Sequence, residues 1–255
     1  MKKGLTIGLA IVLSVGLIIL AVKTYLHFRN GNVEKVTVHI EKQGNKGFLS
    51  DSAVMQMVHS TDSIIGRPVK EVPKKWIMRT ILSSPYVLSS DVYFTIDGNL
   101  VINVKERKPL FRIISNNKTD CYVGDDGSFF PLGKNYVARV MLVNGFINSS
   151  LKMGSRITDS TYSKTLLPGI FNLAQQVNKD PFLKAIISQI FVNSKGEVDL
   201  IPEVGKQVIR FGEPIQVKMK LENLKAFYQQ ALVKEGWNKY KEINLKYTNQ
   251  VVCTK

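Results

Sequence analysis

The residues that could carry catalytic chemistry in this sequence are few. The segment Ser149-Ser150-Leu151-Lys152 matches S-x-x-K, the nucleophile motif of penicillin-binding enzymes. Neither S-D-N nor K-T-G accompanies it, so a surface loop is the better interpretation. Asp120, Asp125 and Asp126 could hold a metal or act as a carboxylate pair, but within DCYVGDDGSFF they are typical of hairpin turns. Nothing here activates a nucleophile or places an acid opposite a base, and neither G-x-S-x-G nor the phosphate-binding G-x-x-x-x-G-K occurs.

The histidines and cysteines do not indicate a metal site. His27 lies beside an apolar N-terminal segment, and His39 and His59 are not at metal-ligand spacing from each other. Cys121 and Cys253 are too far apart in the sequence for a metal motif, and they are either two buried thiols or a single disulfide. We therefore expect a protein that is not an enzyme and that needs no metal and no cofactor.

Charge and composition narrow the class of partner. The chain has 255 residues, with 35 Lys and Arg against 20 Asp and Glu, which gives a formal net charge of +15. Its hydrophobic content of 44% rules out a wholly disordered chain, and its length suits one or two domains. A positive excess favours nucleic acid, anionic lipid or an acidic protein. The lysines are scattered singly, without the interleaved aromatic residues on which bases stack, so we expect no nucleic-acid binding.

The N-terminus contains one long apolar segment. Residues 4–22 carry no charge, and as a helix rising about 1.5 Å per residue they would span close to the ~30 Å hydrocarbon core of a bilayer. A cleavable signal peptide is the alternative, but its apolar region is shorter and ends in small residues, whereas here bulky Ile19 stands two before Ala21. The sequence favours an uncleaved transmembrane helix with a cytoplasmic head (1–3), a juxtamembrane linker (23–32) and the remainder outside the cytoplasm.

The pattern after the linker predicts a β-α-α-β-β domain over residues 33–107. Alternating apolar residues predict a first strand, and Ser50 is a candidate N-cap of a short helix. Pro73 suits the first turn of a second helix, in which Trp76, Ile77, Thr80 and Ile81 recur at three-to-four spacing. Asp97-Gly98 is a strong hairpin-turn signal between two further strands. The expected strands are 33–41, 92–96 and 100–104.

Residues 108–255 are predicted to form a mostly antiparallel β domain with two helices. Short apolar runs are separated by turns rich in Asn, Asp and Gly, which is typical of strands. The helices are expected over 164–178 and 217–234, where apolar residues recur at helical spacing. The fold class is therefore α+β, and the expected strands are 111–114, 121–123, 129–130, 138–143, 189–192, 197–201, 206–211 and 243–253.

The final segment, INLKYTNQVVC (243–253), is predicted to be one long strand at an exposed edge. Its even positions up to residue 250 are polar, which suits a strand with one face on a core and one in solvent. The last strand of an open sheet leaves a row of unpaired backbone groups that a partner strand can use. The odd, core-facing positions are Ile243, Leu245, Tyr247, Asn249, Val251 and Cys253.

Several segments, taken in order, carry a family resemblance. One of them contains the pattern V-x-E-R-x-P, within VINVKERKPL (101–110). The others are SSPYV (83–87), YVGDDGSFFPL (122–132), RFGEP (210–214) and INLKYTNQVV (243–252). Together with the N-terminal span they resemble the FtsQ/DivIB family of bacterial cell-division proteins, and the first domain resembles a POTRA domain. The match is looser in two of these segments, because the family commonly has Asp where this chain has Gly124, and Asn244 and Lys246 replace the acid and the Arg of its last strand.

The resemblance implies a non-enzymatic divisome scaffold that links early and late cell-division proteins at the septum. It implies a single-pass type II protein of the inner (cytoplasmic) membrane with its C-terminal domains in the periplasm. The implied partners are FtsB and FtsL homologues, with FtsK, FtsW and FtsI homologues as further ones. A different POTRA-bearing envelope-assembly or transport module is the alternative.

Within the family the POTRA domain helps recruitment and the β domain binds FtsB by strand addition. The resemblance therefore assigns partner binding to the final strand. Tyr247 has two interpretations, since the family comparison places it at a partner-contacting tyrosine whereas the alternation makes it a core residue. The candidate partner-binding residues are Lys246, Tyr247, Thr248, Asn249 and Val251.

Other residues of the matched segments have structural interpretations. Ile102 and Val104 are core positions of a strand whatever the function. Glu106 and Arg107 are expected to pair with neighbours across the domain junction, and Pro109 to stiffen the link. We prefer these roles to direct partner contact.

Overall fold

The structure is a computed structural model in which the chain forms two units, residues 1–106 and residues 107–255. Residues 2–10, 27, 28, 59 and 235 are described by their backbone alone. Apart from these, the described residues lie within 11–42, 44, 46–59, 64–117, 119–134, 136–237, 239–247 and 250–255.

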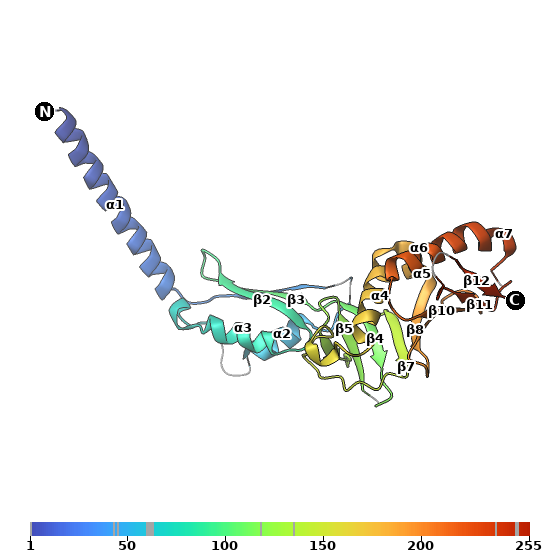
Figure 1. The fold of residues 1–255 in the computed structure, drawn as a ribbon. Helices are drawn as coiled ribbons and strands as arrows, with labels where there is room; N and C mark the ends of the chain where they lie inside the picture. Colours follow the sequence, from blue (N-terminus) through green and yellow to red (C-terminus); the bar gives the residue numbers. More distant parts are fainter. Residues whose placement is uncertain are drawn as a thin grey trace. The chain divides into compact units, whose positions relative to one another are not determined.

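The first unit begins with a long helix, α1 (Lys2–Asn30) (Figure 1). The expected span, residues 4–22, is helical, and the side chains of residues 4–10 lie outside the described residues. Among the described residues, no helix is both long enough and apolar enough to cross a membrane.

After α1 the unit contains a three-stranded sheet with two helices. The strands have the order β1-β3-β2, with β1 parallel and β2 antiparallel to the central β3. The predicted β-α-α-β-β order is observed, and the Ser50 hydroxyl accepts a hydrogen bond from the Ala53 N–H (3.1 Å) as an N-cap should. The elements are β1 (Val36–Glu41), α2 (Asp51–His59), the 3-10 turn η1 (Val69–Glu71), α3 (Lys74–Leu82), β2 (Val87–Phe94) and β3 (Leu100–Glu106).

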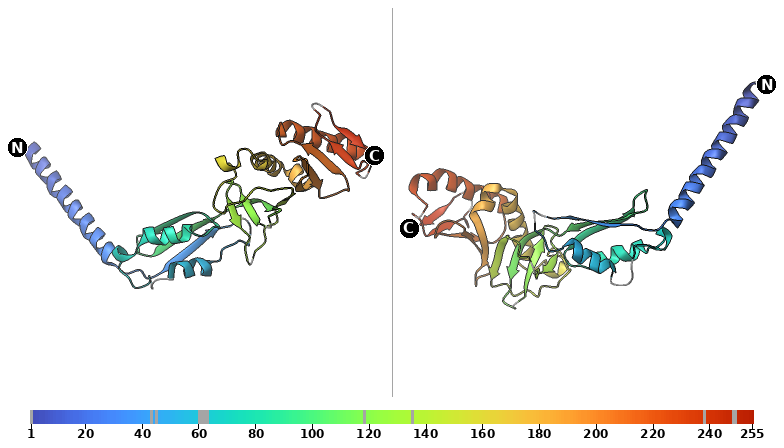
Figure 2. Two further views of the ribbon diagram at one scale, coloured as in Figure 1. Left: turned by 60° about the horizontal axis from the view of Figure 1, so that its bottom comes forward. Right: turned by 180° about the vertical axis from the view of Figure 1, so that it is seen from behind.

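The two helices cover one face of this small sheet (Figure 2). Ile77 and Ile81 of α3 are fully buried, as the three-to-four spacing of that helix predicts, and they share a core with Val54 of α2 and with Ile102 and Val104 of β3. The turn between β2 and β3 has Gly98 at a φ of +80°, a conformation that glycine adopts without strain.

Glu106 joins the end of β3 to the loop before α2. Its side chain is only 4% exposed, and its carboxylate accepts hydrogen bonds from the backbone N–H groups of Leu49 (2.7 Å) and Phe48 (3.3 Å). A Cβ at Gly47 would overlap this carboxylate, so the loop needs glycine there. Glu106 is therefore a structural residue of its own unit.

The second unit is built on a nine-stranded mixed sheet with the order β12-β11-β10-β9-β8-β7-β4-β5-β6. Five of its eight strand pairs are antiparallel and three are parallel. The strands are β4 (Pro109–Ile114), β5 (Asp120–Gly124), β6 (Phe129–Pro131), β7 (Met141–Gly145), β8 (Ile187–Val192), β9 (Val198–Pro202), β10 (Val208–Gly212), β11 (Glu242–Asn244) and β12 (Val252–Thr254).

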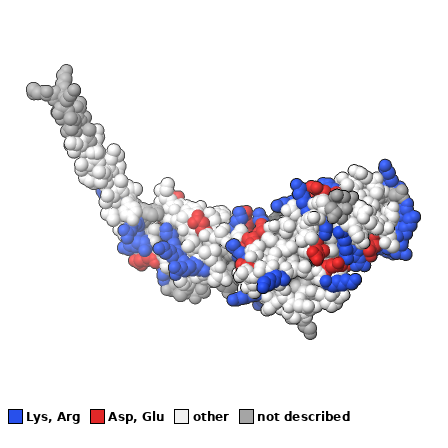
Figure 3. Space-filling view, in the orientation of Figure 1, with Lys and Arg blue, Asp and Glu red and all other residues white. Residues whose placement is uncertain are grey.

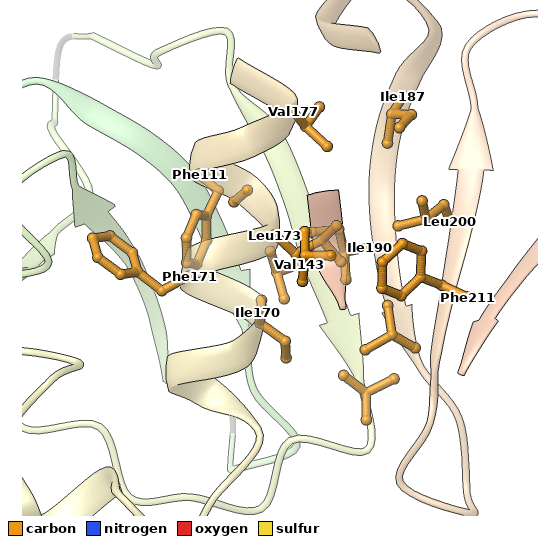
Figure 4. Close-up of a cluster of buried hydrophobic side chains, with 14 of the residues drawn as sticks. Phe111, Val143, Ile170, Phe171, Leu173, Val177, Ile187, Ile190, Leu200 and Phe211 are labelled. Atoms are coloured by element: carbon orange, nitrogen blue, oxygen red, sulfur yellow. The ribbon is translucent and has the colours of Figure 1, made fainter. Parts of the chain in front are cut away.

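Helices pack on one face of this sheet, where the core of the unit lies. Figure 4 shows side chains of α4 (Leu167–Lys179) lying against those of β7, β8, β9 and β10. Asp180 ends α4 and caps the short α5 (Pro181–Ile186), since its carboxylate accepts from the N–H groups of Phe182 (2.9 Å) and Leu183 (3.2 Å).

The second predicted helix is interrupted. It begins as α6 (Val217–Phe227), continues as one π turn, η3 (Tyr228–Leu232), and ends as α7 (Val233–Glu235). Tyr228 and Leu232 are both buried, and the Tyr228 hydroxyl accepts a hydrogen bond from Gln207 (3.0 Å). The π turn therefore faces the core.

Arg107, the first residue of the second unit, holds the turn between β5 and β6. Its guanidinium donates to Asp126 and Ser128. Burial works to raise the pKa of Asp126, but the hydrogen bonds from Ser128 and the charge of Arg107 outweigh it and hold that pKa below its ordinary value. Asp125 and Asp126 are turn residues, as the sequence predicts, because the Gly127 N–H closes the turn on Gly124 (3.0 Å). The same prediction is wrong for Asp120, which begins β5 and pairs with Arg112 of the neighbouring β4 (2.6 Å).

We predict that Glu106→Ala loosens the first unit. Two backbone donors would lose a buried acceptor, so the free energy of unfolding should fall by about 1–3 kcal/mol. Hydrogen exchange of β1 and β3 measures this in the full chain. Glu41→Ala is the matched control, since Glu41 pairs with Lys105 on the surface (3.3 Å) and should cost under about 1 kcal/mol. Equal effects of the two substitutions would contradict the role given to Glu106.

Candidate functional site

The candidate site is the edge of the large sheet at the C-terminus. The expected single strand over 243–253 is wrong, because the chain leaves the sheet after Asn244, reverses direction and returns as β12. β11 is therefore an inner strand, parallel to β10 and antiparallel to β12. β12 is the outermost strand, with no neighbour on its outer side among the described residues.

Contacts distant in the sequence explain why the chain leaves the sheet at this point. Leu245 is still buried in the core, and its N–H donates to the Arg210 carbonyl (2.9 Å). At Lys246 two contacts hold the chain outside the sheet. The Lys246 N–H donates to the Asn244 side chain (3.0 Å), and the Lys246 ammonium pairs with Glu197, the residue just before β9 (2.5 Å). The hydrogen bond from Lys246, together with its positive charge, holds the pKa of Glu197 below its ordinary value.

Of the five predicted binding residues, Lys246, Tyr247 and Val251 lie between β11 and β12. Lys246 and Tyr247 are exposed, and Val251 is half-buried against the core. At 53% exposure Tyr247 is not a core residue, so that interpretation is wrong, while its contact with a partner stays a prediction. Thr248 and Asn249 lie outside the described residues.

The backbone of β12 shows which of its groups face outward. The Thr254 carbonyl accepts from the Lys241 N–H (2.8 Å), so Thr254 directs its peptide groups toward β11. Direction alternates along an antiparallel strand, which leaves Cys253 with its N–H and C=O on the open side. The side chain of Cys253 packs against the core, whereas Val252 is 41% exposed. Sequence reasoning missed Val252 and Thr254, because it continued one strand past Asn244, where β11 ends.

An ion pair with a buried carboxylate stabilises the strands next to this edge. Asp199 on β9 is 2% exposed, and Arg210 on β10 donates to it from Nη1 (2.6 Å). The same guanidinium donates from Nε to Glu242 on β11 (3.0 Å). The hydrogen bond to Glu242 and the charge of Asp199 raise the pKa of Arg210 above its ordinary value. One side chain thus links three neighbouring strands and holds β11 in place.

The surroundings of β12 are positively charged. Lys241 and Lys255 are exposed near the edge, whereas the acidic groups beside it, Glu197 and Glu242, are already paired with Lys246 and Arg210. A partner segment with acidic residues would complement this surface.

Both cysteines are free thiols, so of the two alternatives the disulfide is excluded. Burial, with a smaller contribution from Asp120, raises the pKa of Cys121 to about 12, and burial also raises the pKa of Cys253. Both thiols are therefore protonated and weakly reactive at neutral pH. Over the described residues, His, Cys, Asp and Glu form no group of three that could hold a metal. What this edge can offer is backbone hydrogen bonding to another strand.

We predict that Arg210→Ala loosens the edge. The substitution would leave Asp199 buried without its cation, and because Arg210 is itself a third exposed, we expect a loss of about 2 kcal/mol. Hydrogen exchange of β11 should accordingly be roughly thirtyfold faster. Lys218→Ala is the control, since Lys218 pairs with Glu222 on the exposed face of α6 (3.9 Å) and should change exchange little. Similar exchange in both variants would contradict the supporting role of Arg210.

Two family models match the chain. A POTRA-like domain matches residues 32–105, and the model described as FtsQ/DivIB, C-terminal related, matches residues 108–254, which is more than half of the chain. No curated protein matches the sequence. Both domains predicted by the resemblance are thus found in the expected order, and the chain belongs to the FtsQ/DivIB family.

Proposed function

We propose that this protein is a non-enzymatic scaffold of bacterial cell division. In this proposal α1 anchors the chain in the inner membrane, and both folded units lie in the periplasm at the division septum, where they link early and late division proteins. The observation that carries the proposal is the combination of a POTRA-like domain with an FtsQ/DivIB C-terminal domain whose sheet ends in an open edge. The C-terminal match favours this role over a different POTRA-bearing envelope module.

The surface of α1 supports the anchor. Its described aliphatic side chains from residue 11 to residue 22 are 48–69% exposed and lie on all sides of the helix. A helix that is apolar all round is stable only when something covers it. Moving such side chains from water into hydrocarbon stabilises each by roughly 1.5–3 kcal/mol. The residues are Ile11, Val12, Leu13, Val15, Leu17, Ile18, Ile19, Leu20 and Val22.

The proposed binding mode is addition of a partner strand to β12. The FtsB homologue is the proposed partner strand, with the FtsL homologue beside it and FtsK, FtsW and FtsI homologues as further partners. The outward N–H and C=O of Cys253 would begin the new ladder, and the exposed side chains of Tyr247 and Val252 would contact the partner. Lys246, Thr248, Asn249 and Val251 are the other proposed contacts.

The proposed anchor and topology are tested with a reporter that is active only outside the cytoplasm. When it is fused after Lys255, we expect activity, and the fusion should remain in the membrane fraction after washing with alkaline carbonate. The physical reason is that the long apolar helix stops in the bilayer while the C-terminal units cross it. A soluble product shortened at its N-terminus would contradict the anchor and indicate a signal peptide.

The proposed strand addition is tested with proline. Cys253→Pro removes the N–H that faces the open side and leaves the pairing groups of Val252 and Thr254 with β11 in place. Each lost main-chain hydrogen bond is worth roughly 0.5–1.5 kcal/mol, so pull-down of the FtsB homologue should weaken by about two- to tenfold or more.

The control is Ser194→Pro. Ser194 is exposed and takes the second place of the turn that the Gly196 N–H closes on Asn193 (3.0 Å), a position that proline tolerates well. This variant should bind as the native chain does. Hydrogen exchange of β11 shows whether the Cys253→Pro protein keeps its fold, and undiminished binding by that folded variant would refute strand addition at β12.

A further inference from the structure

The segment that follows the end of α1 in space is strongly basic. Residues 64–79, which we call the basic segment, contain η1 and most of α3. They include five basic residues and a single acidic one, Glu71. Figure 3 shows Lys and Arg side chains gathered where α1 meets the rest of the first unit. The basic residues are Arg67, Lys70, Lys74, Lys75 and Arg79.

Hydrogen bonds hold the basic segment at the end of α1. The backbone of residues 31–33, directly after the helix, exchanges N–H···O bonds of 2.8–2.9 Å with residues 66–69. The Lys70 ammonium donates to the side chain of Asn30, the last residue of α1 (3.2 Å). Val69, Val72 and Ile77 are buried in the core of the unit, so the segment is fixed on both sides.

The length of α1 sets the distance from this segment to a membrane surface. If residues 4–22 fill the hydrocarbon core, residues 23–30 carry the helix about 12 Å beyond it. Headgroups occupy roughly 6 Å of that distance on each side of the bilayer. The remaining ~6 Å is shorter than the ~8 Å Debye length at physiological salt, so charges at the end of α1 still experience the surface potential.

The exposed side chains of the segment suit a lipid surface. Lys70, Lys74 and Lys75 are exposed, and two apolar side chains, Ile65 (50% exposed) and Trp76 (39% exposed), stand among them. Tryptophan is enriched at membrane interfaces because its ring is apolar and its N–H is polar, and each lysine near an anionic surface favours the bound state about fivefold.

We propose that the basic segment binds anionic phospholipid headgroups beside the point where α1 leaves the bilayer. The first unit would then rest against the membrane surface, with Lys70, Lys74 and Lys75 as its main electrostatic contacts. The inference rests on the proposed insertion of α1 and adds a second, charge-dependent attachment to it.

The test uses the full chain in nanodiscs of phosphatidylcholine with and without phosphatidylglycerol, and measures hydrogen exchange of peptides that cover residues 64–79. In the native chain we expect exchange at least about threefold slower when phosphatidylglycerol is present, and the difference should vanish at high salt. The variant K70Q/K74Q/K75Q should lose the lipid dependence. The control K152Q/K164Q/K195Q removes the same amount of charge from exposed sites of the second unit, and its exchange over residues 64–79 should still depend on the lipid.

Each outcome decides between the two proposals. Exchange that is equal in both lipids, with the chain still retained in the nanodisc, would overturn the headgroup contact and leave the anchor intact. Release of the chain from the bilayer by alkaline carbonate would overturn the anchor and the inference together. A lipid effect that survives in K70Q/K74Q/K75Q, or that is lost in the control as well, would also refute the assignment to this segment. The salt dependence of the native chain keeps the test independent of whether the triple variant folds normally.

Discussion

Pairing of backbone N–H and C=O groups is the constraint on which the second unit depends. In the inner strands of a sheet all of these groups are paired, whereas each edge strand leaves about half of its own groups unpaired. Here the strand at one end, β12, is three residues long and is flanked by lysines, features that discourage indiscriminate strand pairing. The same edge remains available to a partner with complementary charge. Its shortness and its proposed function are therefore compatible.

Ionic contacts between strands far apart in the sequence stabilise that edge. Arg210 joins Asp199 and Glu242 across three strands, and Lys246 holds the start of the loop onto Glu197. Such contacts add stability chiefly where a charge is buried, as it is for Asp199, and little where both partners are exposed. The Arg210 group is for this reason the main support of the edge.

Most elements could be predicted from local patterns, and the exceptions have a physical cause. Spacing of apolar residues located α3 and α4, and the Asp97-Gly98 turn located the β2–β3 hairpin. The final strand could not be predicted in the same way. Alternation from residue 243 to residue 250 suits a strand and a hairpin arm equally, and the point where the chain leaves the sheet depends on contacts with residues distant in the sequence, such as those of Leu245 with Arg210 and of Lys246 with Glu197. Of the predicted partner-binding residues, Lys246, Tyr247 and Val251 lie between β11 and β12, and their contact with a partner stays a prediction; Val252 and Thr254 of β12 were not among the predicted residues.

The π turn at η3 has a consequence for how the site tolerates changes in chain length. A π turn contains one residue more than an α-helical turn, so it is equivalent to a single-residue insertion that the helix has absorbed. Deleting one residue from 228–232 would restore regular helix and rotate everything after it by about 100° around the helix axis. Trp237, whose ring lies 5.5 Å from that of Tyr228, would turn away, and the chain would enter β11 from a different direction. The number of residues in this helix, which is not part of the sheet, therefore determines how the chain enters the strand next to the sheet edge.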